Sequence, residues 1–112
     1  FALAKRPLVL SGHTHVAECY RVLDSPRQYE LERASLRHGG TVALENDWKY
    51  LLNPGSCGQP RDANPQARFA LLDTGAARAE IYALDYNWEA ARDAIISAGL
   101  PRVLGERLGE GR

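Results

Sequence analysis

The sequence predicts an α/β chain in which mostly short strands form mixed or antiparallel sheet and helices follow at the C-terminal end. Two observations lead to this prediction. Short apolar runs rich in strand-forming residues recur between turns rich in Gly, Pro, Asn and Asp. After Asn87 the apolar residues adopt a helical spacing instead. No internal repeat or linker divides residues 1–112, which we therefore expect to belong to one domain.

The first three elements differ in how clearly the sequence defines them. Residues 7–11 are a short apolar run that ends at Gly12 and predicts a buried strand. Residues 17–23 alternate in polarity and predict a second strand before the turn residues 24–26. Residues 28–38 are ambiguous, because their composition favours a helix while their alternation also allows a hairpin arm.

The middle of the chain predicts a meander of antiparallel strands. Residues 41–44 and 48–53 are two expected strands joined by the turn-forming cluster 45–47. Residues 68–73 and 78–84 are two more, arranged around a turn at Thr74 and Gly75.

The C-terminal segment predicts two short helices. Asn87 is a good N-cap, and four apolar residues then lie on one helical face. These are Trp88, Ala91, Ile95 and Ala98. Gly99 is expected to stop the first helix and Pro101 to open the second. Three glycines, Gly105, Gly109 and Gly111, are expected to fray the second helix out.

Composition narrows the class of protein. The chain has 14 basic and 14 acidic residues and 45% apolar residues, which is typical of a soluble globular protein and excludes disordered and coiled-coil classes. No apolar run reaches the roughly 18–20 residues of a membrane span, and a net charge of zero argues against a dominant nucleic-acid surface. Lys5 and Lys49 are the only lysines; the Arg excess reflects either codon bias or recognition of oxyanions. Two distant cysteines fit a cytoplasmic location.

The N-terminal residue and the absence of Met suggest a longer protein. The chain starts with Phe1 and contains no Met. We therefore expect that it is one part of a longer translation product.

His13 and His15 are the candidate metal ligands. They follow the expected buried strand directly, in the sequence Gly12-His13-Thr14-His15. In an extended backbone, residues two apart point to the same side, so both imidazoles would serve one metal ion or a pair of ions. The alternative is that the H-x-H spacing arose by chance in an exposed loop.

Residues 53–62 form a second candidate segment, a loop dense in Gly and Pro. Asn53, Ser56, Gln59 and Arg61 supply polar groups that can steady a metal site or meet a phosphate. A purely structural turn is the alternative for each of these residues.

The two segments together resemble a known family. Residues 8–15, which end in G-H-T-H, resemble the last metal-binding motif, G-H-x-H, of the calcineurin-like metallophosphoesterases. Residues 53–62, N-P-G-S-C-G-Q-P-R-D, are similar to the N-P-G-S-V-G-x-P-R-D loop of the small bacterial and archaeal, phosphodiesterase-like branch, with Cys57 in place of the usual Val. Residues 86–91 and 98–101 resemble the C-terminal helices of that branch.

The resemblance implies a fold and an activity. The family's fold is an α/β/β/α sandwich of two facing mixed sheets flanked by helices, and the chain would supply strands of one sheet and the closing helices. The activity would be hydrolysis of a small-molecule phosphate mono- or diester by water that two divalent ions (Mn, Fe, Zn or Ni) activate. His13 would ligate the second ion and His15 the first, with Asn53, Ser56 and Arg61 supporting the site or substrate.

The rest of the family's ligand set has no counterpart here. The D-x-H, G-D-x-x-D and G-N-H-[DE] motifs are absent, and His38 lies downstream of His15, so it is expected to be a surface residue. No catalytic residue can be placed. We expect an N-terminal half of the same protein to carry the missing motifs, and the isolated chain to be inactive. We also expect that chain to expose a sheet face and strand edges, so that it is unstable or forms a homodimer.

Two alternatives stay open at this point. One is a small non-catalytic zinc-binding module whose four ligands are His13, His15, Cys19 and Cys57. The other is a non-catalytic regulatory relative of the phosphoesterases.

Overall fold

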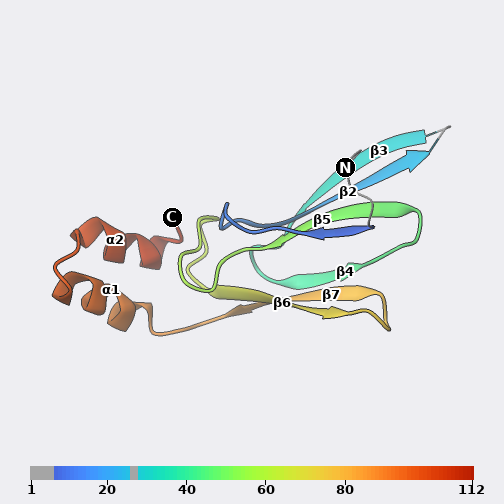
Figure 1. The fold of residues 1–112 in the computed structure, drawn as a ribbon. Coiled ribbons are helices and arrows are strands. Elements are labelled where there is room, and N and C mark those ends of the chain that lie inside the picture. Colours follow the sequence, from blue (N-terminus) through green and yellow to red (C-terminus); the bar gives the residue numbers. More distant parts are fainter. Residues whose placement is uncertain (1–6, 26–27) are drawn as a thin grey trace.

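A computed structural model describes residues 7–25 and 28–112, which form two sheets and a helical C-terminal end (Figure 1). The strands are β1 (Leu8–Leu10), β2 (Ala17–Ser25), β3 (Gln28–Ser35), β4 (Gly40–Ala43), β5 (Trp48–Pro54), β6 (Ala67–Asp73) and β7 (Arg78–Leu84). The helices are α1 (Trp88–Ser97) and α2 (Arg102–Glu106), and a 3₁₀ turn, η1 (Arg107–Glu110), follows. The predicted α/β class is confirmed.

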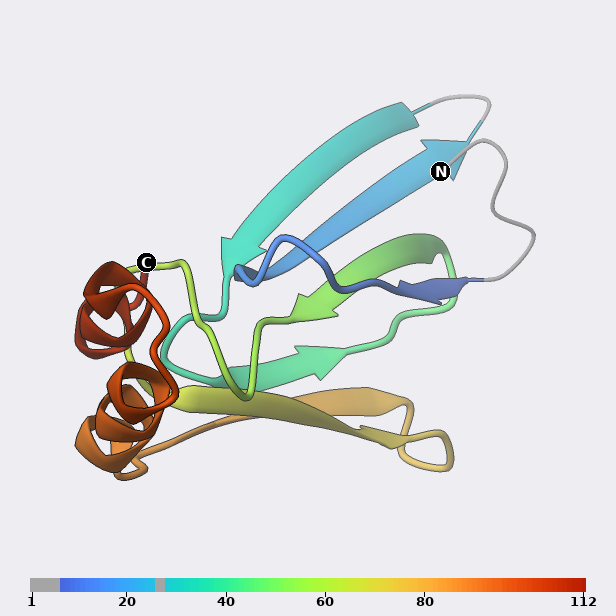
Figure 2. The same cartoon turned by 60° about the vertical axis from the view of Figure 1, so that its left-hand side comes forward.

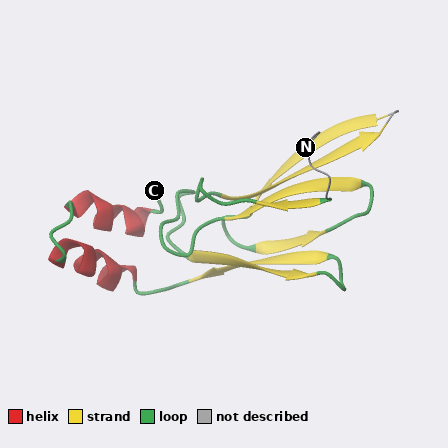
Figure 3. Cartoon of the chain, viewed as in Figure 1, coloured by secondary structure: helices red, strands yellow, loops and turns green. Residues whose placement is uncertain are grey.

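The two sheets face each other (Figures 2 and 3). Side chains from both sheets form the core between them. The larger sheet has the order β1-β5-β2-β3, with β1 parallel to β5 and the other pairs antiparallel. The smaller sheet has the order β4-β7-β6 and is antiparallel throughout. The buried core residues are Ala17, Cys19, Leu36, Tyr50, Leu52, Ala79 and Ile81.

β1 lies within the apolar run, but the expectation of a buried strand was wrong: β1 is an edge strand whose Val9 and Leu10 are 36% and 58% exposed. β2 lies where alternation predicts it, with one extension. β2 continues through Asp24 and Ser25, which we expected in a turn, while Pro26 lies outside the described residues. The ambiguous segment 28–38 is a hairpin arm, because β3 pairs along its whole length with β2. Long-range pairing, which a single sequence does not show, overrides the helix propensity of this segment.

The predicted antiparallel meander was wrong. β4 pairs with β7 in the smaller sheet, whereas β5 pairs with β1 and β2 in the larger one. Residues 45–47 therefore carry the chain from one sheet to the other instead of closing a hairpin. The expectation that the chain supplies strands of one sheet was also wrong, since its described strands form two sheets. The hairpin of β6 and β7 is confirmed.

α1 begins and ends as predicted, and α2 begins as predicted after Pro101, but both helices are placed differently from the expectation. The Asn87 side chain accepts from the Ala90 amide at 2.9 Å, and Gly99 adopts a φ of 75° after α1. Both helices lie beyond one end of the sheets instead of flanking a sheet face (Figures 1 and 2). Among the described residues, no helix combines the length and the apolar character that a membrane crossing requires.

The three C-terminal glycines do not fray the chain. Gly105 is buried against Arg92, where an added Cβ would lie 2.9 Å from Arg92 Cγ. Gly109 lies flat against the ring of Trp88, and Gly111 packs on the backbone of Asn64. The expectation was wrong because these glycines permit close packing, so the helical path continues to Glu110.

Candidate functional site

The Gly12–His15 segment forms a tight loop between β1 and β2. The Thr14 amide donates to the Gly12 carbonyl at 2.9 Å, which closes a turn around His13. His13 and His15 have φ angles of 73° and 60°, in the left-handed region that residues other than glycine rarely adopt. The expectation of an extended backbone through the two histidines was therefore wrong. Strain of this kind is concentrated at functional sites, and here it falls on the two candidate ligands.

The His15 ring is oriented by the second candidate loop. Its Nδ1 lies 2.8 Å from the carbonyl oxygen of Gln59. A carbonyl only accepts, so a hydrogen bond at this distance requires the tautomer with the proton on Nδ1, which has its lone pair on Nε2. Metal-ligating histidines commonly donate their second ring nitrogen to a carbonyl or carboxylate in this way. The donor chemistry of His15 therefore fits a metal ligand.

Asn53 joins the two loops. Its side chain is only 4% exposed, and its Nδ2 donates to the Gly12 carbonyl at 3.1 Å and to Thr14 Oγ1 at 2.8 Å. Its Oδ1 accepts from the Gly55 amide at 3.0 Å. Each of these bonds fixes backbone or side-chain atoms of the two loops. Asn53 therefore holds the histidine loop, residues 12–15, in its conformation.

Ser56 and Arg61 have separate places in the second loop. Ser56 Oγ accepts from the amides of Gly58 and Gln59, at 3.3 and 2.9 Å, and so fixes the path of the loop. The Arg61 amide donates to the His15 carbonyl at 3.0 Å. The Arg61 side chain is exposed and donates to Gln59 Oε1 at 2.9 Å, which leaves other guanidinium donors facing solvent.

A buried ion pair below the loops was missed by sequence reasoning. The Arg68 guanidinium pairs with the Asp62 carboxylate, and Asp62 Oδ2 also accepts from the Ala17 amide at 3.0 Å. Burial lowers the pKa of Arg68, while the neighbouring Asp62 charge opposes that shift. The available signal was the alternation of β6, which puts Arg68 on the same inward face as Ala70.

The four residues of the zinc-module alternative are not brought together. The part of the chain that the structure describes holds no group of three or more His, Cys, Asp or Glu placed to bind a metal. Cys19 belongs to the core, where burial raises the pKa of its thiol, while Cys57 is exposed in its loop. A buried neutral thiol is a poor metal ligand. The set His13, His15, Cys19 and Cys57 is thus not a site in this structure.

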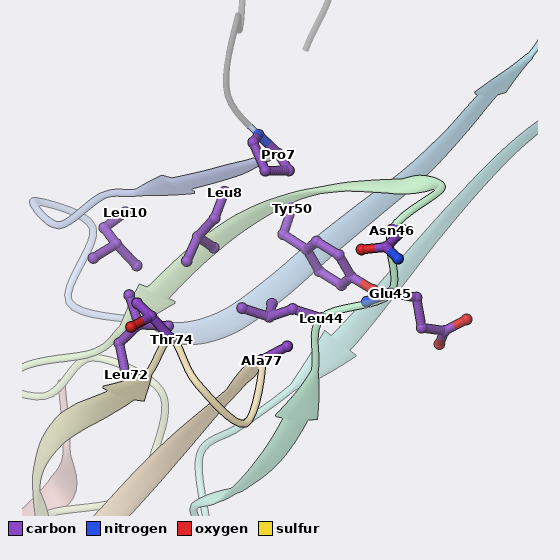
Figure 4. Close-up of a pocket in the computed structure, with 10 residues that line it drawn as sticks. All are labelled: Pro7, Leu8, Leu10, Leu44, Glu45, Asn46, Tyr50, Leu72, Thr74 and Ala77. Carbon is purple, nitrogen blue, oxygen red and sulfur yellow. Dashed lines mark hydrogen bonds between the residues drawn. The ribbon is translucent and has the colours of Figure 1, made fainter.

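A hollow of about 480 Å³ lies away from these loops, at the β1 edge between the two sheets (Figure 4). Its walls are mainly apolar and include Leu8, Leu10, Leu44, Tyr50 and Leu72. The candidate site residues His13, His15, Asn53, Ser56 and Arg61 do not line it. It is a gap in the packing of the sheets at an open edge, and it is separate from the histidine loop.

Comparison with known proteins places this geometry in context. The chain is similar over 97% of its length to the crystal structure of a metallophosphoesterase from Sphaerobacter thermophilus, with a TM-score of 0.84 and 29% identity. The chain shares the metallophosphoesterase fold. It is also 37% identical over 105 residues to an uncharacterized protein of Methanocaldococcus jannaschii. No family model matches the sequence.

The chain covers less than half of each of these two proteins. The chain spans 44% of the Sphaerobacter structure and 40% of the Methanocaldococcus protein, while 94% of this chain is matched in the latter. The shared fold thus accounts for nearly all of this chain.

Proposed function

We propose that this chain is the C-terminal part of a binuclear-metal phosphoesterase and contributes His13 and His15 to its metal centre. The contact of His15 Nδ1 with the Gln59 carbonyl carries the proposal. It leaves the lone pair of Nε2 available to bind a metal ion, and it joins the two motif segments. The shared fold supports it. His15 would serve the first ion and His13 the second, and one chain alone would be inactive with so few ligands.

The proposed reaction is hydrolysis of a small-molecule phosphate mono- or diester. Two divalent ions, drawn from Mn, Fe, Zn and Ni, would activate a water and stabilise the charge that develops on the phosphoryl oxygens. In this chain, Asn53 and Ser56 would hold the loops so that the imidazoles stay in place. The exposed guanidinium of Arg61 would meet a phosphate oxygen, because its planar set of donors matches that group.

The rest of the protein is the partner that we propose for the open side of the sheets. β1 is an edge strand, and the hollow beside it exposes apolar walls, including Leu10. Exposed strand edges with apolar neighbours invite further strands. A remaining part of the same protein would cover this edge and bring the other metal ligands to the histidine loop.

Phosphatase assays of the intact gene product with Mn²⁺ test the proposal. Removal of a residue that supports a metal ligand costs roughly 10- to 100-fold in activity. His13→Ala and His15→Ala remove the proposed ligands themselves, so each should lose more activity than that. His38→Ala is the matched control, because His38 is exposed and lies outside the loops. It should retain full activity. Undiminished activity in both loop variants would contradict the proposal.

A further inference from the structure

The buried pair of Arg68 and Asp62 is an unusual feature of so small a core. The Arg68 side chain is fully shielded from solvent, and that of Asp62 is 6% exposed. The guanidinium also donates to the Arg37 carbonyl at 2.9 Å and to the Asn64 carbonyl at 3.3 Å, while its Nε has no partner among the described residues. Removing two charges from water is costly, and apolar side chains often stabilise such positions as well or better. Stability alone therefore does not explain the pair.

The pair contacts the histidine loop from one side. Asp62 Oδ2 accepts from the Ala17 amide, two residues beyond His15. The preceding residue, Arg61, donates its amide to the His15 carbonyl. The Asp62 carboxylate and the backbone amide of the residue before it are thus bonded to Ala17, the first residue of β2, and to His15, two residues before it.

The pair also reaches the loop that orients the ring. The Arg68 amide donates to the Ser56 carbonyl at 2.9 Å, and Gly55 lies so close that an added Cβ would be 3.0 Å from Arg68 Nε. Ser56 in turn fixes the Gln59 amide, and Gln59 supplies the carbonyl that meets His15 Nδ1. Arg68 is thus bonded through its backbone amide to the loop that supplies the Gln59 carbonyl, while its guanidinium lies beneath Gly55 and pairs with Asp62, which bonds to the Ala17 amide near His15.

We propose that Asp62 and Arg68 are positioning residues that hold the Gln59 carbonyl against His15 Nδ1 and so fix the orientation of the imidazole ring. The effect on the His15 ring depends only on contacts within this chain. Its value for metal binding rests on the function proposed above. Neither residue is expected to touch metal or substrate, because both side chains are buried beneath the loops.

NMR of the His15 ring tests the inference directly. Long-range ¹H–¹⁵N correlation spectra of the metal-free intact gene product, recorded at about pH 8.5 where an unperturbed imidazole is neutral, report which nitrogen carries the proton. The His15 signals are assigned by their loss in His15→Gln. The unchanged protein should show the proton on Nδ1. Asp62→Asn and the double variant Asp62→Leu with Arg68→Leu should shift the ring to a mixture of both tautomers.

The double variant distinguishes a loss of positioning from a loss of folding. It removes both charges at once, which a buried pair tolerates better than the loss of one partner. Glu106→Gln is the matched control, because it breaks an exposed ion pair with Arg102 on α2. It should leave the His15 signals unchanged. A folded double variant whose His15 ring keeps its proton on Nδ1 would overturn the inference.

Metal affinity separates this inference from the proposed function. Titration with Mn²⁺ should show a roughly 10- to 100-fold weaker binding in the double variant, the usual cost of losing support behind a ligand. If the double variant changes the tautomer of His15 but His15→Ala keeps full phosphatase activity, the positioning role stands and the proposed function is rejected. An unchanged tautomer together with an inactive His15→Ala would do the reverse.

Discussion

Gly55 shows how closely the second loop packs beneath the histidines. Its φ is 93°, and an added Cβ would lie 3.0 Å from Arg68 Nε and 3.1 Å from Ala17 Cβ. Both the backbone conformation and the space at this position therefore require glycine. Gly58, three residues further along the same loop, has neither a positive φ nor any atom within 4 Å of such a Cβ.

Gly55→Ala should lower the free energy of unfolding by about 1–3 kcal/mol, because the new methyl group combines a strained φ with a close contact. Urea denaturation of the intact gene product measures the change. Gly58→Ala is the control and should shift the midpoint little. Equal midpoints for the two variants would show that the loop is not packed as the structure describes.

The sequence could identify the candidate residues but not their arrangement. The motif pattern selects His13, His15 and Asn53, and the structure places all three at or below one loop. The same-side argument for the histidines failed, because it assumes extended backbone and each histidine has a positive φ. Asp62 and Arg68 were overlooked because a salt bridge between a loop and a strand depends on tertiary packing, which residue spacing does not reveal.

At the scale of elements, the local sequence pattern predicts whether a segment is a strand or a helix better than it predicts which strands pair. Alternation marked β2, β6 and β7, and a capping Asn marked the start of α1. The partner of each strand is set by the summed packing of two sheets, so β4 and β5 were joined wrongly as neighbours. The same limit applies to the C-terminal glycines, whose use depends on Trp88 and Arg92 nearby.

Gly109→Ala tests the packing of α1 on η1. The new Cβ would lie 2.6–2.9 Å from three atoms of the Trp88 ring, which must move away. We expect a loss of about 1–3 kcal/mol in stability, typical of overpacking, together with a shift in Trp fluorescence. Gly75→Ala is the control, since its Cβ would meet only Asp73 Oδ1 at 3.5 Å. An unchanged Trp88 environment in Gly109→Ala would contradict this packing.

At the scale of the whole molecule, the described chain is long and thin. Its extents are 57 × 25 × 20 Å and its radius of gyration is 16.7 Å, against roughly 13 Å for a compact domain of this length. The hollow beside β1 and the outer face of β6 expose apolar side chains, with Leu10 58% and Leu71 55% exposed. An elongated body with exposed apolar edges presents more surface for association than a compact domain does.

The 112-residue chain should therefore self-associate through the β1 edge, because β1 pairs only with β5 among the described strands and its outer edge lies beside an apolar hollow. Leu10→Lys places a charge in that hollow and should weaken dimerisation about 10-fold or more, as measured by sedimentation velocity across a concentration series. Val103→Lys is the matched control, because Val103 is 61% exposed but lies on α2, far from the edge. If Val103→Lys weakens association as much as Leu10→Lys does, general apolar exposure, and not the strand edge, drives it. A chain that stays monomeric at every concentration would instead show that the open edge does not attract a second strand.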